Sequence, residues 1–255
     1  MKKTIFLTIG VCLGLITTGA NAKTFSQSVG TGNFEVNLSA EKYEFDTKMI
    51  TTSGGYLPPN FNRDFDAPVD REILTLRAAY GILDQLDVFA GIGYVDEEWT
   101  GDDKVSTSDY KETGKNPMFE IGLKGTAFKV LEEKMYFSYL LKYSYLESGE
   151  HFSGPNHADS SKAIWKEYNA SMETGYNFDS IGLTPYAGIS YFYIKGRQEL
   201  DNYATITNYD SEFENEKSVG CYLGLDYKLN DNVSLDLQGD FFVKTGFKLF
   251  ASYVF

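Results

Sequence analysis

The sequence predicts an all-β protein: a closed, antiparallel, up-and-down transmembrane barrel of about ten strands, with eight as the alternative. Three observations predict it: a two-residue hydrophobic period, segments of about 9 to 13 residues, and connections that alternate between short and long. Strands of soluble sheets are typically only about 5 to 6 residues long. The rival architecture is a soluble two-sheet sandwich, which also alternates apolar and polar residues.

The first 22 residues have the composition of a secretory signal peptide. Lys2 and Lys3 precede an apolar run over residues 5–16, and Ala20-Asn21-Ala22 forms a small-residue cleavage site. The run is too short to span a bilayer as a helix, which takes about 20 residues. We therefore expect residues 1–22 to be removed and residues 23–255 to form one barrel domain.

Charge and cysteine content narrow the possible partners. The chain has a formal net charge of −13, and removal of Lys2 and Lys3 makes it −15. No basic patch is visible, so nucleic acid is not an expected partner. Cys221 is the only cysteine after residue 22, which excludes an internal disulfide in the mature chain.

The ten segments are clearest at the C-terminus, where every second residue from Phe247 to Phe255 is apolar. The predicted strands cover residues 34–40, 74–80, 86–94, 119–127, 135–145, 168–178, 183–193, 219–229, 233–244 and 246–255.

Short turns are expected at 83–85, 129–134, 179–180 and 230–232, and long polar loops at 46–71, 96–115, 147–162 and 195–217. The connection at 244–245 is tight although it falls on the long-loop side. Transmembrane barrels show this alternation, and an even strand count brings both ends of the chain to the short-turn side.

Aromatic residues at the strand ends predict two girdles at the water–lipid boundaries. The inner girdle would contain Tyr80, Tyr176, Phe178, Tyr227, Tyr253 and Phe255, and the outer girdle Tyr94, Tyr143, Tyr145, Tyr168, Tyr191, Tyr193, Phe241 and Phe247.

Two stretches carry a resemblance to a known family. The segment 246–255, ending in Tyr-Val-Phe, resembles the terminal signal that bacterial outer-membrane barrels present to their assembly machinery, and the hairpin 80–94 is similar to hairpins of OmpA-like, porin-superfamily barrels. The resemblance implies a Gram-negative cell outer membrane as the location and its lipid as a partner. It also implies contact with the assembly machinery through Phe247, Leu249, Ala251, Tyr253 and Phe255. We expect a monomer.

If the apolar faces meet lipid, the opposite faces line the lumen and carry charges of both signs. These residues are Glu35, Glu41, Arg77, Glu120, Lys124, Lys142, Glu167, Glu173, Asp226, Lys228, Asp236, Asp240, Lys244 and Lys248. In a small barrel the side chains fill the interior, so the first interpretation is a network of ion pairs. The second is a narrow, mildly cation-preferring pore.

No enzyme, metal or cofactor site is expected. The omptin surface proteases need an Asp two residues before a His, but Gly149 and Pro155 occupy those positions before His151 and His157. No G-x-S-x-G elbow occurs, and the two histidines match no strong metal-binding motif.

The leading hypothesis is therefore a non-enzymatic barrel, either structural or a narrow passive channel for ions and small solutes. A surface adhesin that acts through its long acidic loops is the second hypothesis, and an outer-membrane enzyme is the third.

Overall fold

The computed structural model describes residues 27–52, 64–101, 110–154, 157–202, 207–215 and 217–255. The expected signal peptide lies outside these residues. The described residues form eleven antiparallel strands: β1 Phe34–Thr52, β2 Asp64–Leu83, β3 Leu86–Gly101, β4 Tyr110–Val130, β5 Met135–Gly154, β6 His157–Tyr176, β7 Leu183–Asn202, β8 Thr207–Asn215, β9 Val219–Lys228, β10 Val233–Phe241 and β11 Thr245–Val254. They contain no helix long and apolar enough to cross a membrane.

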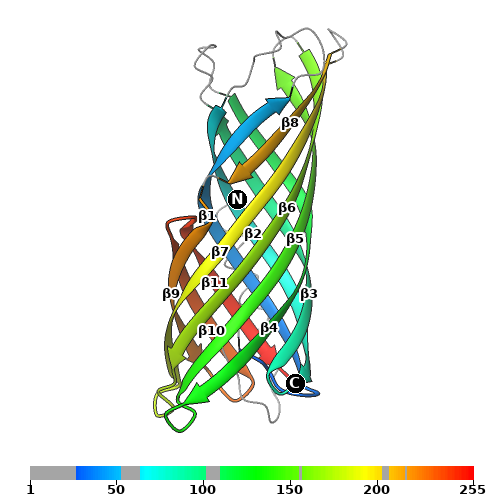
Figure 1. Ribbon diagram of the computed structural model, residues 1–255. Coiled ribbons are helices and arrows are strands. Elements are labelled where there is room, and N and C mark those ends of the chain that lie inside the picture. The colour runs from blue at the N-terminus through cyan, green and yellow to red at the C-terminus, as the bar shows by residue number, and fades with distance from the viewer. Residues whose placement is uncertain (1–26, 53–63, 102–109, 155–156, 203–206, 216) are drawn as a thin grey trace.

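The strands close into a barrel because β1 pairs on both of its edges. One edge of β1 pairs with β2. The other edge pairs with β11 over Glu35–Glu44 and then with β8 over Thr47–Thr52. Figure 1 shows β9, β10 and β11 in the lower half of the wall and β8 in the upper half. The predicted closed antiparallel barrel is confirmed.

The number of strands in the wall changes with height. In the lower half β7 pairs with β9, which gives ten strands around the barrel. In the upper half β7 pairs with β8, and β8 pairs with β1, which gives eight. The change occurs where the hairpin of β10 and β11 turns back at residues 242–244, partway up the wall. The tight connection in this region is thus a turn within the wall.

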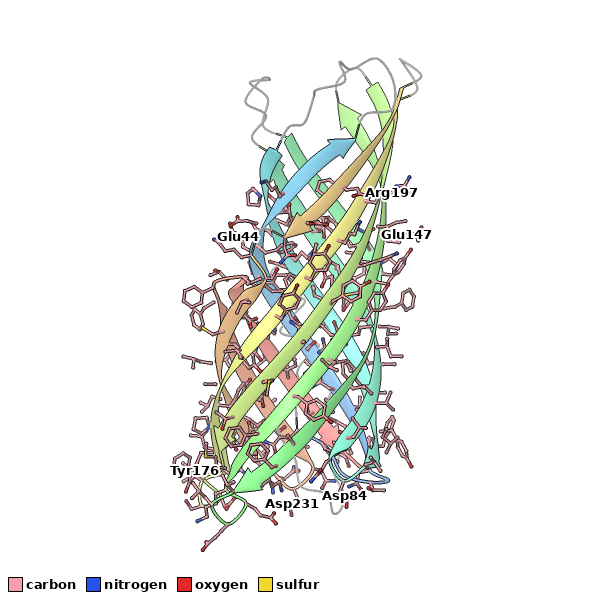
Figure 2. The ribbon with its side chains drawn as sticks, viewed as in Figure 1. Glu44, Asp84, Glu147, Tyr176, Arg197 and Asp231 are labelled. Carbon is pink, nitrogen blue, oxygen red and sulfur yellow. The ribbon has the colours of Figure 1, made fainter. Side chains whose placement is uncertain are left out.

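An uncharged band surrounds the lower half. Figure 2 shows Glu44, Glu147 and Arg197 on the outer face in the upper half, and Asp84 and Asp231 at the lower turns. Between these two levels none of the described outward side chains is charged, and large apolar ones such as Leu76, Ile92, Ile121, Leu223 and Leu237 are exposed. A band of this kind suits a hydrocarbon layer.

Above this band the alternation continues but the polarity inverts. On β1 the outward residues change from Leu38 and Ala40 to Lys42, Glu44 and Asp46, while the inward ones change from polar to Tyr43 and Phe45. We call the part of the wall above the band the upper wall.

The prediction of long loops at 46–71, 96–115, 147–162 and 195–217 was wrong for their described parts, which belong mostly to strands. Strands β1 to β7 are 16 to 21 residues long, about twice the predicted length. The charged outward residues of the upper wall made these segments resemble solvated loops.

The four predicted short turns are present at the lower end, and the aromatic residues gather as expected. Phe34 contacts Phe255 with tilted rings whose centroids are 5.8 Å apart, and the ring centroid of Tyr253 lies 4.5 Å from that of Phe255. At the upper edge of the band Tyr143, Tyr168 and Tyr193 form a row across β5, β6 and β7, with neighbouring centroids 5.3 and 6.2 Å apart. The two girdles therefore bound the uncharged band.

Replacing Ile92 by Arg tests whether hydrocarbon covers the band. Ile92 is 59% exposed on the outer face of β3, and a cation there should lower the free energy of unfolding by about 2 to 4 kcal/mol in phospholipid vesicles. The matched control is Glu98→Arg on the same face of the same strand in the upper wall, which should change stability by less than about 1 kcal/mol. Urea titration measures both, and equal effects of the two variants would contradict a lipid-facing band.

Candidate functional site

The interior of the barrel holds most of its buried polar groups. All fourteen charged residues that the sequence places on the inner faces project from the inner side of the wall. Eleven of them are less than one-tenth exposed, and the other three, Lys142, Lys228 and Lys248, are partly exposed. Burial of this kind is expensive unless each charge is paired and hydrogen-bonded, so the pairs decide what the interior can do.

The lowest layer of the interior is centred on Lys124 of β4. Its Nζ pairs with Glu35 of β1 and lies 3.8 Å from Asp87 of β3. Asp87 also accepts hydrogen bonds from the Ser28 hydroxyl at 2.6 Å and the Val29 backbone N–H at 2.8 Å. A segment that precedes the first strand is thereby held inside the lower end. The sequence analysis did not identify Asp87 as a site residue, although it alternates with Val88 at the start of β3.

The middle layer is centred on Arg77 of β2. Its guanidinium pairs with Glu120 of β4, donates to Glu41 at 2.9 Å and donates to the Ser39 hydroxyl at 2.6 Å. Lys142 of β5 lies 3.5 Å from the same Glu120. A planar guanidinium with several donors can bridge carboxylates on two different strands, so this layer ties β1, β2, β4 and β5 together across the lumen.

The upper layer is centred on Arg71, six residues before Arg77 on β2. It donates to Glu97 of β3 at 2.5 Å and pairs with Glu167 of β6. The guanidinium carbon lies 5.0 Å from the ring centroids of both Phe45 and Trp165. Arg71 and Glu97 were placed in loops by the sequence analysis, because the inversion of polarity concealed the strand pattern there.

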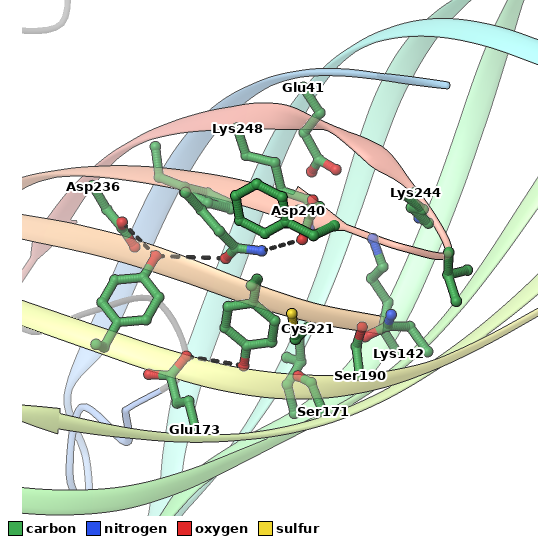
Figure 3. A pocket seen from close by; sticks show the side chains of 18 of the residues that line it. Glu41, Lys142, Ser171, Glu173, Ser190, Cys221, Asp236, Asp240, Lys244 and Lys248 are labelled. Atoms are coloured by element: carbon green, nitrogen blue, oxygen red, sulfur yellow. Dashed lines mark hydrogen bonds and ion pairs between the residues drawn. The ribbon is translucent and has the colours of Figure 1, made fainter. Parts of the chain in front are cut away.

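A layer of tyrosines and carboxylates lies on the side of the lumen formed by β5, β6, β7, β9 and β10. The Tyr186 hydroxyl donates to Asp236 at 2.6 Å, and the Tyr222 hydroxyl donates to Glu173 at 3.2 Å. Figure 3 shows these bonds at one end of a cavity. Asp226 of β9 faces Asp236 directly across the two strands, so this side of the interior is acidic.

Two glycines make room for these tyrosines. A Cβ at Gly224 would lie 2.1 Å from the Tyr186 ring, and one at Gly188 would lie 2.2 Å from the Tyr222 ring. Tyr186 of β7 stands directly opposite Gly224 of β9, and Tyr222 of β9 stands directly opposite Gly188 of β7, so that each ring lies over a glycine. The sequence contained a signal for the inward rings, because a glycine faces each of them, but the register needed to use that signal was unknown.

Lys248 and Lys244 occupy the other end of the cavity. Lys248 pairs with Asp240 at 3.1 Å, and Asp240 accepts a hydrogen bond from Gln238 at 2.7 Å. The Lys244 Nζ lies 3.5 Å from the ring centroid of Phe192 and 4.1 Å from that of Tyr43, which is cation–π geometry. The remaining predicted residue, Lys228, pairs with Asp231 at a lower turn, 3.0 Å away.

The cavity among these side chains has a volume of about 60 Å³ and is lined by residues of β1, β2, β5, β6, β7, β9, β10 and β11. It reaches from Asp236 to Lys142 and Lys244 (Figure 3). A space of this size holds only a few water molecules.

An apolar cluster fills the lumen above the cavity, and we call it the upper core. Its residues come from β1 to β8 and from the turn between β10 and β11: Tyr43, Phe45, Val69, Ile73, Val95, Met118, Leu146, Trp165, Phe192, Ile194, Phe213 and Val243. Trp165, Ile194 and Phe213 are fully buried. Arg71, paired with Glu97 and Glu167, packs against Phe45 and Trp165 of this cluster. Closely packed side chains therefore lie between the cavity and the upper end.

A metal ion needs several ligating side chains in a suitable geometry. Within the described residues no three His, Cys, Asp or Glu side chains are arranged to hold a metal ion. The backbones of His151 and His157 lie in the β5–β6 hairpin and not in a loop, while their side chains lie outside the described residues. The arrangement provides ion pairing, hydrogen bonding and hydrophobic closure.

Comparison with known proteins identifies the fold. The outer membrane protein OprG from Pseudomonas aeruginosa matches with a TM-score of 0.57 and 11% identity, over 90% of this chain and 98% of that one. The chain has the outer-membrane β-barrel fold. An outer membrane channel from Pseudomonas putida F1 (TM-score 0.41, 12% identity, 91% and 98% covered) and the attachment protein Ail from Yersinia pestis (0.32, 10%, 88% and 99%) match more loosely. No protein-family model and no curated protein matches the chain.

Replacing Arg77 by Met tests the buried pairs of this barrel. The change leaves Glu41 and Glu120 without their main cation, and we expect a loss of about 3 to 5 kcal/mol in the free energy of unfolding. The matched control is Lys42→Met, which removes a pair with Glu72 between the same two strands. That pair is 2.7 Å long, but both side chains are about half exposed, so its loss should cost less than about 1 kcal/mol.

Urea unfolding in vesicles measures both variants. A triple variant, Arg77→Met with Glu41→Gln and Glu120→Gln, should recover part of the loss, because it removes the unpaired charges as well. Equal stability of the Arg77 and Lys42 variants would show that the middle layer contributes no more than a surface pair.

Proposed function

We propose that the protein is an integral, non-enzymatic outer-membrane barrel with a structural role, whose interior does not conduct. Its lower half would cross the lipid, and its upper wall would stand outside the cell. The observation that carries the proposal is the upper core, because a packed apolar layer across the lumen blocks water and ions. The ion pairs below it support the same conclusion, since they fill the lumen with side chains that hold one another.

A narrow passive channel is the second candidate, and one observation favours it. The cavity beneath the upper core is lined by carboxylates and amines, among them Asp240 and Lys248, which pair with each other at 3.1 Å. An aqueous path would form if the upper core rearranged.

An adhesin is the third candidate, because the upper wall displays charged residues to the outside. An enzyme has the least support.

Planar-bilayer recording separates the first two functions. We expect no discrete openings from the wild-type barrel, since the upper core leaves no aqueous path. The ring centroids of Trp165 and Phe213 lie 5.5 Å apart in that core. Replacing both residues by Ala should empty part of the core and produce a measurable ion current. Discrete openings of the wild-type protein would contradict the structural proposal and support a channel.

We also propose that Phe247, Leu249, Ala251, Tyr253 and Phe255 form the signal read by the outer-membrane assembly machinery. Their support is position: they share the outward face of β11, the last strand to close the wall against β1. The fourteen inward charges are proposed to hold the folded wall together from within. The protein would work as a monomer surrounded by outer-membrane lipid.

Removing the Phe255 ring tests the assembly signal. Phe255→Ala should lower the amount of barrel assembled in cells several-fold, because the machinery would lose its terminal aromatic residue, while refolding of the purified chain in detergent should be nearly unchanged. The control is Phe178→Ala, since Phe178 is also an exposed aromatic of the lower girdle, 45% exposed against 60% for Phe255. Equal losses for both variants, measured by heat-modifiable migration on gels, would refute a signal at the terminus.

A further inference from the structure

The outer face of the barrel carries an apolar groove that the interior does not explain. It has a volume of about 350 Å³ and is open to the outside, across β4, β5, β6 and β7. Its sides are formed by Ile121, Leu123 and Leu141, and the small side chain of Ala170 leaves its floor low. The lining is almost wholly apolar, which suits a hydrocarbon chain and gives no partner to a polar ligand.

The upper end of the groove is bounded by tyrosines at the edge of the uncharged band. Tyr143 and Tyr168 line the groove and face each other across β5 and β6, and Tyr191 lines it from β7. Tyrosine at a water–lipid boundary places its ring among lipid tails and its hydroxyl among headgroups. The groove therefore lies in the outer half of the band, directly beneath the headgroup level.

A cationic strip lies immediately above these tyrosines. Lys166 of β6 and Lys195 of β7 are exposed on the outer face and stand directly opposite each other across the two strands. Arg197 is exposed two residues further along β7 (Figure 2). Like charges directly opposite each other destabilise a sheet, and an anion placed between them would reverse that effect.

The strip differs in sign from the outward faces of β1, β2 and β3 in the upper wall. On β1, β2 and β3 the described outward charges are mainly acidic, with Lys42 and Lys48 against Glu44, Asp46, Asp70, Glu72, Asp96 and Glu98. On β6 and β7 the described outward side chains above the tyrosines include three cations and no carboxylate. On the neighbouring strand β8, Glu214 stands opposite Lys195 and Glu212 stands opposite Arg197. Lys195 approaches Glu212 at 3.7 Å, but both side chains are about half exposed, and such a pair is weak.

We propose that the groove and the strip form one site for a phosphorylated lipid of the surrounding outer leaflet, with an acyl chain in the groove and a phosphate between Lys166 and Lys195. The inference rests on the proposed position of the barrel in the outer membrane. A tail in the groove and a charge-assisted contact above it match the two ends of one amphiphile. Neither feature alone would select such a ligand.

The test uses the full mature barrel, purified in neutral detergent, with lipid A as the probe and native mass spectrometry as the measurement. Lys166→Gln with Lys195→Gln should weaken retention about tenfold, as expected for the loss of a charge-assisted contact. Ala170→Phe should weaken it by a similar factor by filling the groove. The matched controls are Lys42→Gln with Lys48→Gln on β1, and Ala78→Phe on the outer face of β2.

Without its phosphates, lipid A should bind the wild-type barrel only as weakly as intact lipid A binds the lysine variant. Excess inorganic phosphate should compete poorly with lipid A, because it has no acyl chain. Retention by the Ala170 and lysine variants equal to that of their controls would overturn the site. Vesicle insertion is measured in parallel: failure of every variant and of the wild type to insert would overturn the proposed location, and normal insertion without selective retention would overturn the lipid site alone.

Discussion

The structure depends on the requirement that β1 be paired along both edges for nearly its whole length. Within hydrocarbon an unpaired backbone N–H or C=O costs several kcal/mol, so a wall with a free edge cannot persist there. Within the band, β11 meets this requirement over Glu35–Glu44. Above the band, β8 pairs the same edge over Thr47–Thr52, where a free edge would face water and could pair with another chain. The short β10–β11 hairpin and the change from ten strands to eight follow from this division of one edge between two partners.

Along the closed wall, side chains alternate between the inner and outer faces with a period of two residues, and the polarity of each face differs between the lower half and the upper wall. Around the lower half the outward residues are apolar, and the inward residues are polar and pair with one another, as Arg77 does with Glu120. Around the upper wall the outward residues are charged, and the inward ones form an apolar core that includes Trp165 and Phe213 and encloses the ion pairs of Arg71. The exchange of polarity on β1 between Ala40 and Tyr43 marks the level at which the outer surroundings change.

The two kinds of interior have complementary effects. Buried ion pairs are weak sources of net stability, yet breaking one is costly, so Lys124, Arg77 and Arg71 hold specific strands at specific positions across the lumen. The upper core contributes hydrophobic burial and closes the lumen. A small cavity lies below the upper core, and there the Lys244 ammonium contacts the rings of Tyr43 and Phe192. On the outer face, the groove beneath Lys166 and Lys195 combines an apolar surface with a charged one in the same way.

The sequence by itself determined the β class, the short turns, the girdles and the faces of residues such as Glu35, Lys124 and Asp236, because strand alternation is a local property that each segment carries alone. Only the tertiary structure decided that Arg71 meets both Glu97 and Glu167, that β8 exists, and that Tyr186 lies over Gly224. These depend on register between strands far apart in the chain, and on whether water or lipid lies outside a given level of the wall. Neither the register nor the surroundings of a given level can be read from a single segment, since both are fixed only when the strands assemble into the closed wall.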